Sequence, residues 1–366
     1  MNAGSLAEES LEELESKADA ISDPKYFNFP WIDVEIVRKI PSDLDFNNFV
    51  NVKWVYLFAF ERKERFLNIF FRYLCDGSNS NLYTGVWQSA PVIIKVIKRD
   101  VMHLEVAKAE FDFEIDTLSR LSHPNIISIL AWGVQKGRKF IVLEPLNEVG
   151  MAMNPPKSFE KKERVFQRGL SLCLQLAKSL AYIHGELHSR AMIIHRDLKV
   201  DNVGVATDGI LKLFDFGLSR CVLKRQKETE AYKMTGGTGT LRYMAPEVAL
   251  SLHYNEKADV YSYAIVIWAL LSKQIPFKDL DRKGFRDRVV LGGERPPLDD
   301  SWPAWLKALL CQAWNPDPIL RPSMTEVVRM FDLNFDASPS ASEESSQLIV
   351  GKAGGRTSVG CCKGLF

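Results

Sequence analysis

The stretch HRDLKVDN at residues 195–202 and the DFG at 215–217 decide the fold of this chain. The first stretch places a His, an Arg, a Lys, two Asp and an Asn between the apolar runs AMII (191–194) and VGV (203–205). A polar loop that apolar strands hold at both ends is a rigid place for catalytic groups.

Three oxygen-bearing side chains of this region suit a magnesium site. Asp197 and Asn202 lie in the loop, and Asp215 follows a second apolar run, ILKLF (210–214). Mg²⁺ prefers a few carboxylate or amide oxygens plus substrate phosphates, so Asn202 and Asp215 could supply them. Asp197 then stays free to accept a proton from a hydroxyl. Burying a carboxylate without a partner would cost several kcal/mol of folding free energy. A metal ion, or a partner such as Lys199, would remove this cost.

Composition places the chain among ordinary globular proteins. Of its residues, 46% are hydrophobic and 25% are charged, which is ordinary for such proteins. The length of 366 residues is enough for two domains or for one large bilobal domain. A net charge of +1 gives no electrostatic reason to expect a nucleic-acid or membrane partner. The cysteine spacing forms neither a zinc pattern nor a disulfide framework, so we expect a reduced, cytoplasmic setting.

Hydrophobic patterning predicts a strand-rich lobe at 66–147 and a larger helical lobe at 148–335. The smaller lobe has strand-like runs around 70–74, 81–87 and 91–98, a helix at 104–121 and a strand pair around 127–144. In the larger lobe, apolar residues recur at helical spacing over 165–184.

The ends of the chain give weaker signals. Residues 1–65 read as a partly helical extension, with an amphipathic helix at 5–20 and no apolar signal segment. Residues 336–366 are rich in Ser and Gly and are predicted to be disordered. Membrane attachment is not expected, except for possible acylation of Cys361 and Cys362; adjacent cysteines in a flexible tail are more often only tail.

The motif set resembles that of eukaryotic protein kinases. HRDLKVDN, DFG, MAPE (244–247) and VIIK (92–95) occur in that family's order and spacing. The segment RPPLDDSWPAWLKALLCQAWNPDPILRPSM (295–324) is most similar to the tyrosine-kinase-like group of Ser/Thr kinases. The resemblance covers roughly residues 69–333 and implies an α+β bilobal protein kinase fold that uses ATP and Mg²⁺.

The resemblance also assigns roles to single residues. Lys95 is implied to hold the ATP phosphates and to pair with Glu114 on the predicted helix. Arg321 is implied to pair with Glu247, and Asp259 to steady the catalytic loop. Lys95 as an ordinary strand lysine, and Glu114 as one solvated charge beside Glu105 and Glu110, are the plainer alternatives.

The phosphate-covering loop departs from the family pattern. Cys75 and Ser80 stand where two of the three glycines are expected, and only Gly77 remains. Backbone N–H groups approach phosphates most easily where no Cβ intervenes, so nucleotide binding is either kept by these small residues or weakened. Leu82 takes the usual valine position and is expected to cover the adenine.

The adenine pocket shows a paired departure. Ile93 replaces a small residue above the ring and Gly204 replaces a larger one below it, so the ring could sit slightly lower. The hinge VLEPLN (142–147) is expected to offer backbone groups of Glu144 and Leu146 to the adenine edge.

The expected acceptors are Ser and Thr hydroxyls of protein substrates. Lys199, two residues after Asp197, is typical of Ser/Thr kinases, and Thr240 is expected to bridge the two. Two other readings stay open. A pseudokinase scaffold is favoured only by the altered phosphate loop, and an interaction protein would act through residues 1–65 and the tail.

Control by phosphorylation is also predicted. Arg196 could pair with a phosphate on the loop at 215–247, which offers Thr229, Tyr232, Thr235 and Thr238. Thr235 and Thr238 lie nearest the usual distance from the MAPE segment. The alternative is that Arg196 only packs and the loop is always ordered.

Overall fold

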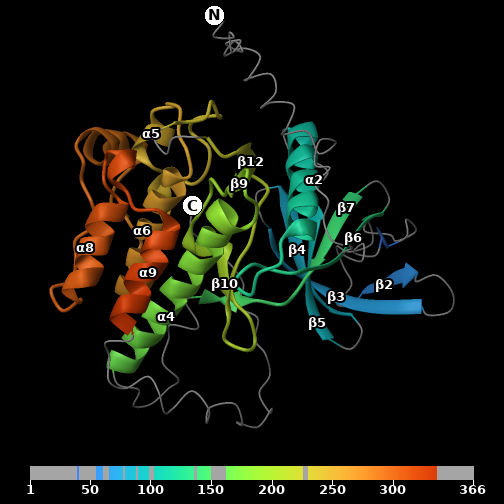
Figure 1. Ribbon diagram of the computed structural model, residues 1–366. Coiled ribbons are helices and arrows are strands. Elements are labelled where there is room, and N and C mark those ends of the chain that lie inside the picture. The colour runs from blue at the N-terminus through green and yellow to red at the C-terminus, as the bar shows by residue number, and fades with distance from the viewer. Residues whose placement is uncertain are drawn as a thin grey trace, which may run out of the picture.

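Two lobes make up the protein, one built on a single large β-sheet and the other mainly helical (Figure 1). The predicted α+β bilobal fold is therefore confirmed. The architecture is that of a computed structural model. It describes residues 39–40, 55–60 and 66–76 as backbone, and residues 79–87, 90–98, 103–135, 138–149, 162–225 and 230–335.

The small lobe is a seven-stranded sheet with one helix, α2 (Leu104–Arg120), against it. All neighbouring strands are antiparallel except β1, which runs parallel to β6. In spatial order the strands are β1 (Lys39–Ile40), β6 (Ile129–Gln135), β7 (Arg138–Leu143), β5 (Ala90–Ile97), β4 (Ser80–Trp87), β3 (Phe66–Asp76) and β2 (Val55–Phe60).

Alternation along β5 decides what faces the space between the lobes. Val92, Ile94 and Val96 are almost fully buried in the core of the small lobe. Because successive side chains of a strand point to opposite faces, Ile93 and Lys95 share the other face. The sequence of one strand thereby places an apolar residue and a cation side by side.

The larger lobe forms around α6 (Lys257–Ser272), which is apolar on all sides. Every residue from 257 to 271 except Ser262 is buried, as expected for a helix without a polar face. Around it lie α4 (Lys162–Ala181), a π-helical turn (Tyr182–Glu186), α5 (Pro246–Ala249), α7 (Arg282–Gly284), a second π-helical stretch (Phe285–Leu291), α8 (Ala304–Ala313) and α9 (Met324–Phe335), several of them visible in Figure 1.

Two small sheets hold the polar loops of the larger lobe. In one, β9 (Ala191–Ile194) pairs with β12 (Arg220–Leu223). In the other, β10 (Val203–Val205) lies between β8 (Asn147–Glu148) and β11 (Leu211–Leu213). Short 3-10 turns occur at Val200–Asn202, Leu241–Tyr243 and Pro318–Leu320. The polar loops at 195–202 and 214–219 therefore have paired strands at both ends, which fix the positions of the loops.

Most elements predicted from the sequence are present. The predicted strands around 70–74, 81–87 and 91–98 and the helix at 104–121 correspond to β3, β4, β5 and α2. The sheet also takes in β1 and β2, from the stretch before residue 66. The predicted helix at 5–20 and the tail at 336–366 lie outside the described residues. Within the described part, no helix combines the length and apolar character that crossing a membrane requires.

Candidate active site

Asp259, in the first turn of α6, fixes the backbone of the polar loop. Its carboxylate accepts hydrogen bonds from the backbone N–H groups of His195 at 2.7 Å and Arg196 at 2.9 Å. These bonds hold Arg196 at a left-handed φ of 69°. Burial would raise the pKa of Asp259, but the hydrogen bonds from His184 and the Arg196 N–H lower it below its usual value. The predicted anchoring of the loop by Asp259 is confirmed.

Asp197 lies at the centre of a buried hydrogen-bond network. One carboxylate oxygen accepts bonds from the Thr240 N–H and hydroxyl, both at 2.8 Å. The other accepts from Lys199 Nζ at 2.9 Å and Asn202 Nδ2 at 3.3 Å. Lys199 Nζ also donates to the Thr240 hydroxyl at 3.1 Å, so the predicted bridge by Thr240 is confirmed. The network holds the carboxylate in one orientation.

Lys95 joins helix α2 to the DFG segment. Its Nζ donates to both Glu114 oxygens, at 2.9 and 2.7 Å, and to Asp215 Oδ1 at 2.9 Å. Burial would lower the pKa of Lys95, but the two carboxylates outweigh it and the pKa is raised. Burial likewise opposes ionisation of Asp215, yet Lys95 lowers its pKa. The predicted Lys95–Glu114 ion pair is present. Burial raises the pKa of Glu114, and the Lys95 ammonium opposes this shift.

The chemistry of Asn202 and Asp215 fits a magnesium ion. The Phe214 N–H donates to the Asn202 carbonyl at 3.1 Å, which brings the two segments together. The Asn202 Nδ2 donates to the Asp197 carbonyl at 2.8 Å, which leaves its amide oxygen as the group for a cation. Asp215 has a φ of 65°, and its side chain is 39% exposed. One of its oxygens binds Lys95, and no hydrogen bond from a described residue to the other is observed.

The expected adenine-binding residues lie on one face of the small-lobe sheet. Leu82 pairs directly with Lys95 across β4 and β5, so Leu82, Ile93 and Lys95 share that face. In the hinge, the Glu144 N–H donates to the Ser128 carbonyl at 3.4 Å, which leaves the Glu144 carbonyl for a ligand. Gly77 lies outside the described residues.

Leu146 packs against Gly204 at the expected floor of this pocket. A Cβ built on Gly204 would lie 2.9 Å from Leu146 Cδ1 and 3.0 Å from Leu146 Cβ. The room that Gly204 leaves is therefore filled by Leu146, which directly precedes β8, the antiparallel neighbour of β10. The hypothesis of an adenine ring that sits lower stays a prediction.

The activation segment packs on Arg196. Its guanidinium donates to Tyr254 Oη at 2.8 Å, to the Thr235 carbonyl at 3.1 Å and to the hydroxyls of Thr235 and Thr238, the latter at 3.1 Å. Tyr232, in contrast, is buried, and its hydroxyl donates to the Leu223 carbonyl at 2.6 Å. Among the described residues of the loop, Thr235 and Thr238 are the hydroxyls that meet Arg196. Tyr232 is not accessible in this arrangement, and Thr229 lies outside the described residues.

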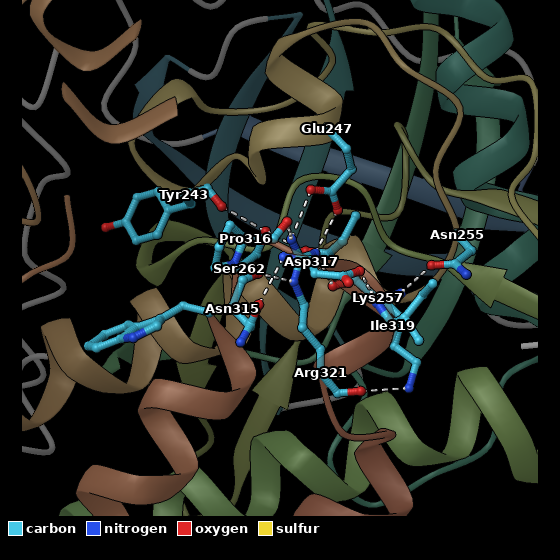
Figure 2. Close-up of polar contacts among 12 residues, drawn as sticks. Tyr243, Glu247, Asn255, Lys257, Ser262, Asn315, Pro316, Asp317, Ile319 and Arg321 are labelled. Atoms are coloured by element: carbon cyan, nitrogen blue, oxygen red, sulfur yellow. Dashed lines mark hydrogen bonds and ion pairs between the residues drawn. The ribbon is translucent and has the colours of Figure 1, made fainter. Parts of the chain in front are cut away.

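A buried ion pair ties the segment after this loop to the end of the domain (Figure 2). Arg321 donates to both oxygens of Glu247, at 2.6 and 2.9 Å, and to the Lys257 carbonyl at 2.9 Å. Lys257 Nζ returns a bond to the Arg321 carbonyl at 2.8 Å. The predicted Arg321–Glu247 pair is confirmed, and both side chains are almost fully buried.

Sequence reasoning missed the Lys95–Asp215 contact, and it also missed a contact at the turn before β4. Asn79 Nδ2 donates to Glu110 Oε2 at 3.1 Å and thereby connects the turn before β4 with helix α2. Glu110 appears in the sequence only as one of several helix charges, similar to Glu105. Its position one helical turn before Glu114 was the one signal that it shares a face with the ion pair.

Together, the two lobes, the lysine–carboxylate pair and the loop with Asp197, Lys199 and Asn202 define a phosphotransferase site of the protein kinase class. A sequence model described as protein tyrosine and serine/threonine kinase matches residues 69–331. The chain belongs to this family.

Several characterised kinases are similar to it. It is 32% identical over 258 residues to the serine/threonine-protein kinase STY17 of Arabidopsis thaliana, and the match covers 70% of this chain and 42% of that protein. It is 31% identical over 261 residues to the serine/threonine/tyrosine-protein kinase HT1 of the same plant, and the match covers 70% of this chain and 64% of HT1. It is 32% identical over 260 residues to mitogen-activated protein kinase kinase kinase 7 of Bos taurus, and this match covers 70% of this chain and 42% of that kinase. The chain thus spans less than two thirds of the length of these relatives.

Proposed function

We propose that the protein transfers the γ-phosphoryl group of ATP to serine or threonine hydroxyls of protein substrates. The observation that carries the proposal is the buried network in which Lys199 and Thr240 orient the Asp197 carboxylate. The similar proteins STY17 and HT1 are named as serine/threonine and serine/threonine/tyrosine kinases, which supports the same reaction.

Each charged group has a place in this reaction. Lys95, held by Glu114, would bind the ATP phosphates, and Asn202 and Asp215 would hold Mg²⁺. Bound Mg²⁺ would neutralise charge on the triphosphate. Asp197 would orient the substrate hydroxyl and accept its proton, and Lys199 would stabilise charge on the transferred group. Most of the rate enhancement would come from positioning and charge neutralisation.

The adenine would bind between the lobes. Leu82 and Ile93 would cover one side of the ring, and Leu146 with Gly204 would form the other. The backbone groups of Glu144 and Leu146 would meet its edge, and Gly77 would lie near the phosphates.

The test separates an active kinase from a pseudokinase. We expect purified protein with MgATP and a peptide array to form ADP, and Asp197→Asn to reduce the rate by about 10²- to 10⁴-fold. Asp201→Asn is the matched control, because Asp201 is an exposed aspartate of the same loop. Chelation of Mg²⁺ with EDTA should abolish turnover. Nucleotide binding without turnover of any peptide would favour the pseudokinase.

We further propose that a phosphate on Thr235 or Thr238 is held by Arg196. A phosphate would add charge-assisted hydrogen bonds to a guanidinium that already meets both hydroxyls. Intact-mass analysis after incubation with MgATP should show an added phosphate that the Thr235→Ala, Thr238→Ala double variant lacks. Tyr232→Phe should keep it. An unmodified loop in active protein would mean that Arg196 only packs.

A further inference from the structure

Glu110 connects the turn before β4 with helix α2. The Asn79 side chain donates to its carboxylate at 3.1 Å, and the Asn79 carbonyl accepts a bond from the Lys98 N–H at 3.0 Å. Ser80, the next residue, is only 5% exposed. The turn is thus tied on one side to the helix and on the other to the end of β5.

Glu110 also lies beside the DFG segment. A Cβ built on Gly217 would be 3.7 Å from the Glu110 carbonyl oxygen and 3.8 Å from Glu110 Cβ, which is ordinary van der Waals contact. Farther along this segment, the Arg220 guanidinium lies 5.7 Å from the centre of the Phe113 ring. One residue of α2 therefore meets both the phosphate loop and the segment that carries Asp215.

The glycine-poor sequence of the phosphate loop gives a reason to expect a role for the Asn79–Glu110 contact. Cys75 and Ser80 occupy positions where glycines would let backbone N–H groups approach phosphates closely. The Asn79 side-chain bond to helix α2 is one contact that fixes the position of this turn. Burial raises the pKa of Glu110, so its ionised form gains from the hydrogen bond that Asn79 donates.

We propose that Glu110 is a positioning residue that latches the turn at Asn79, directly before β4, onto helix α2, so that this turn and the Lys95–Glu114 pair are positioned together. The inference rests on the proposed nucleotide site. Because Glu110 and Glu114 are one helical turn apart, a movement of α2 would shift the loop and the lysine partner together.

The first experiment measures the latch without nucleotide. Hydrogen exchange of the amides at 79–82 should become faster in Asn79→Ala and in Glu110→Ala than in the wild type. Glu110→Gln should keep the protection, because its amide oxygen can accept the same bond. Glu105→Ala is the control: the Glu105 side chain lies on the same helix, is 85% exposed and pairs only with Lys108 among the ion pairs described. Unchanged exchange in both alanine variants would overturn the proposal.

The second experiment measures MgADP affinity by calorimetry. Asn79→Ala and Glu110→Ala should each weaken binding by about 2- to 13-fold, the range for loss of a typical hydrogen bond, because this bond is exposed. The double variant should lose no more than either single one, because both remove the same contact. Additive losses, or wild-type affinity in Asn79→Ala, would contradict the latch.

Different results would contradict the proposed kinase activity and the proposed latch. If the wild type binds MgADP but phosphorylates no peptide, the proposed activity fails while the latch is still decided by exchange and affinity. If Glu110→Ala does not fold, Asn79→Ala still decides the outcome, because Asn79 lies in a turn and its removal leaves the helix intact.

Discussion

The α-carbon of Gly239 packs directly against the carbonyl oxygen of Arg196. A Cβ at this position would lie 2.4 Å from that oxygen and 3.3 Å from Asp197 Oδ1, and the φ of Gly239 is +100°. This close approach is what lets the next residue, Thr240, donate its N–H and hydroxyl to Asp197.

Gly239→Ala should therefore reduce kcat by about 10- to 100-fold, because strain of about 1–3 kcal/mol would displace Thr240 from Asp197. Gly209→Ala is the control, since Gly209 has a φ of +86° but nothing within 4 Å of an added Cβ. It should lower the melting temperature slightly and leave kcat unchanged. Equal kcat losses in both variants would mean that backbone strain alone, and not the contact with Arg196, is responsible.

Gly204→Ala should destabilise the protein by about 1–3 kcal/mol, because its methyl group would overlap Leu146. In the Gly204→Ala, Leu146→Ala double variant the methyl group gains room, so the combined loss should be smaller than the sum of the single losses. A double-mutant cycle from urea unfolding measures this coupling. Additive losses would show that Leu146 does not fill the floor.

Arg321→Ala should destabilise the larger lobe by about 3–5 kcal/mol, because it leaves the Glu247 carboxylate buried without its partner. Arg288→Ala is the comparison. Arg288 pairs with Glu294 at 2.6 Å, but its side chain is 60% exposed, so a loss below about 1 kcal/mol is expected. Urea unfolding at 25 °C checks both values, and similar losses would contradict the burial argument.

Asp259→Asn should lower the free energy of unfolding by about 1–3 kcal/mol. The carboxylate now accepts hydrogen bonds from the N–H groups of His195 and Arg196, and the NH₂ group of the asparagine would face one of these two donors. The pKa of Asp259 is lowered in the folded state, so its contribution is present above the ordinary value of 3.8. It is lost as the pH falls through the lower folded value. The stability difference from the wild type should thus stay constant from about pH 5 to 8 and shrink only below about pH 4. Unfolding titrations across this range would contradict the assignment if the difference grew toward acid.

Much of the site could be predicted because its motifs match those of a known family in order and spacing. The resemblance to protein kinases implied the Lys95–Glu114 and Arg321–Glu247 pairs, and both are present. The ion pair between Lys95 and Asp215 was not predicted, because the sequence assigned Asp215 to a magnesium ion.

Other features depend on packing that the sequence does not show. Glu105 and Glu110 are the same residue type on one helix, and only the fold makes one exposed and the other a partner of Asn79. The filling of the Gly204 site depends on the register in which β8 pairs with β10. Strand β1 is only two residues long, too short for any period to appear.

The two outer strands of the small-lobe sheet, β1 and β2, determine where an expression fragment of the domain should begin. The family match begins at residue 69, yet β1 and β2 lie before it and part of β3 does too. An expression fragment that starts at 69 would uncover unpaired backbone N–H and C=O groups along β6 and β3, which are templates for aggregation. Fragments for crystallisation or inhibitor screening should therefore begin before residue 39, so that β1 and β2 stay paired with β6 and β3.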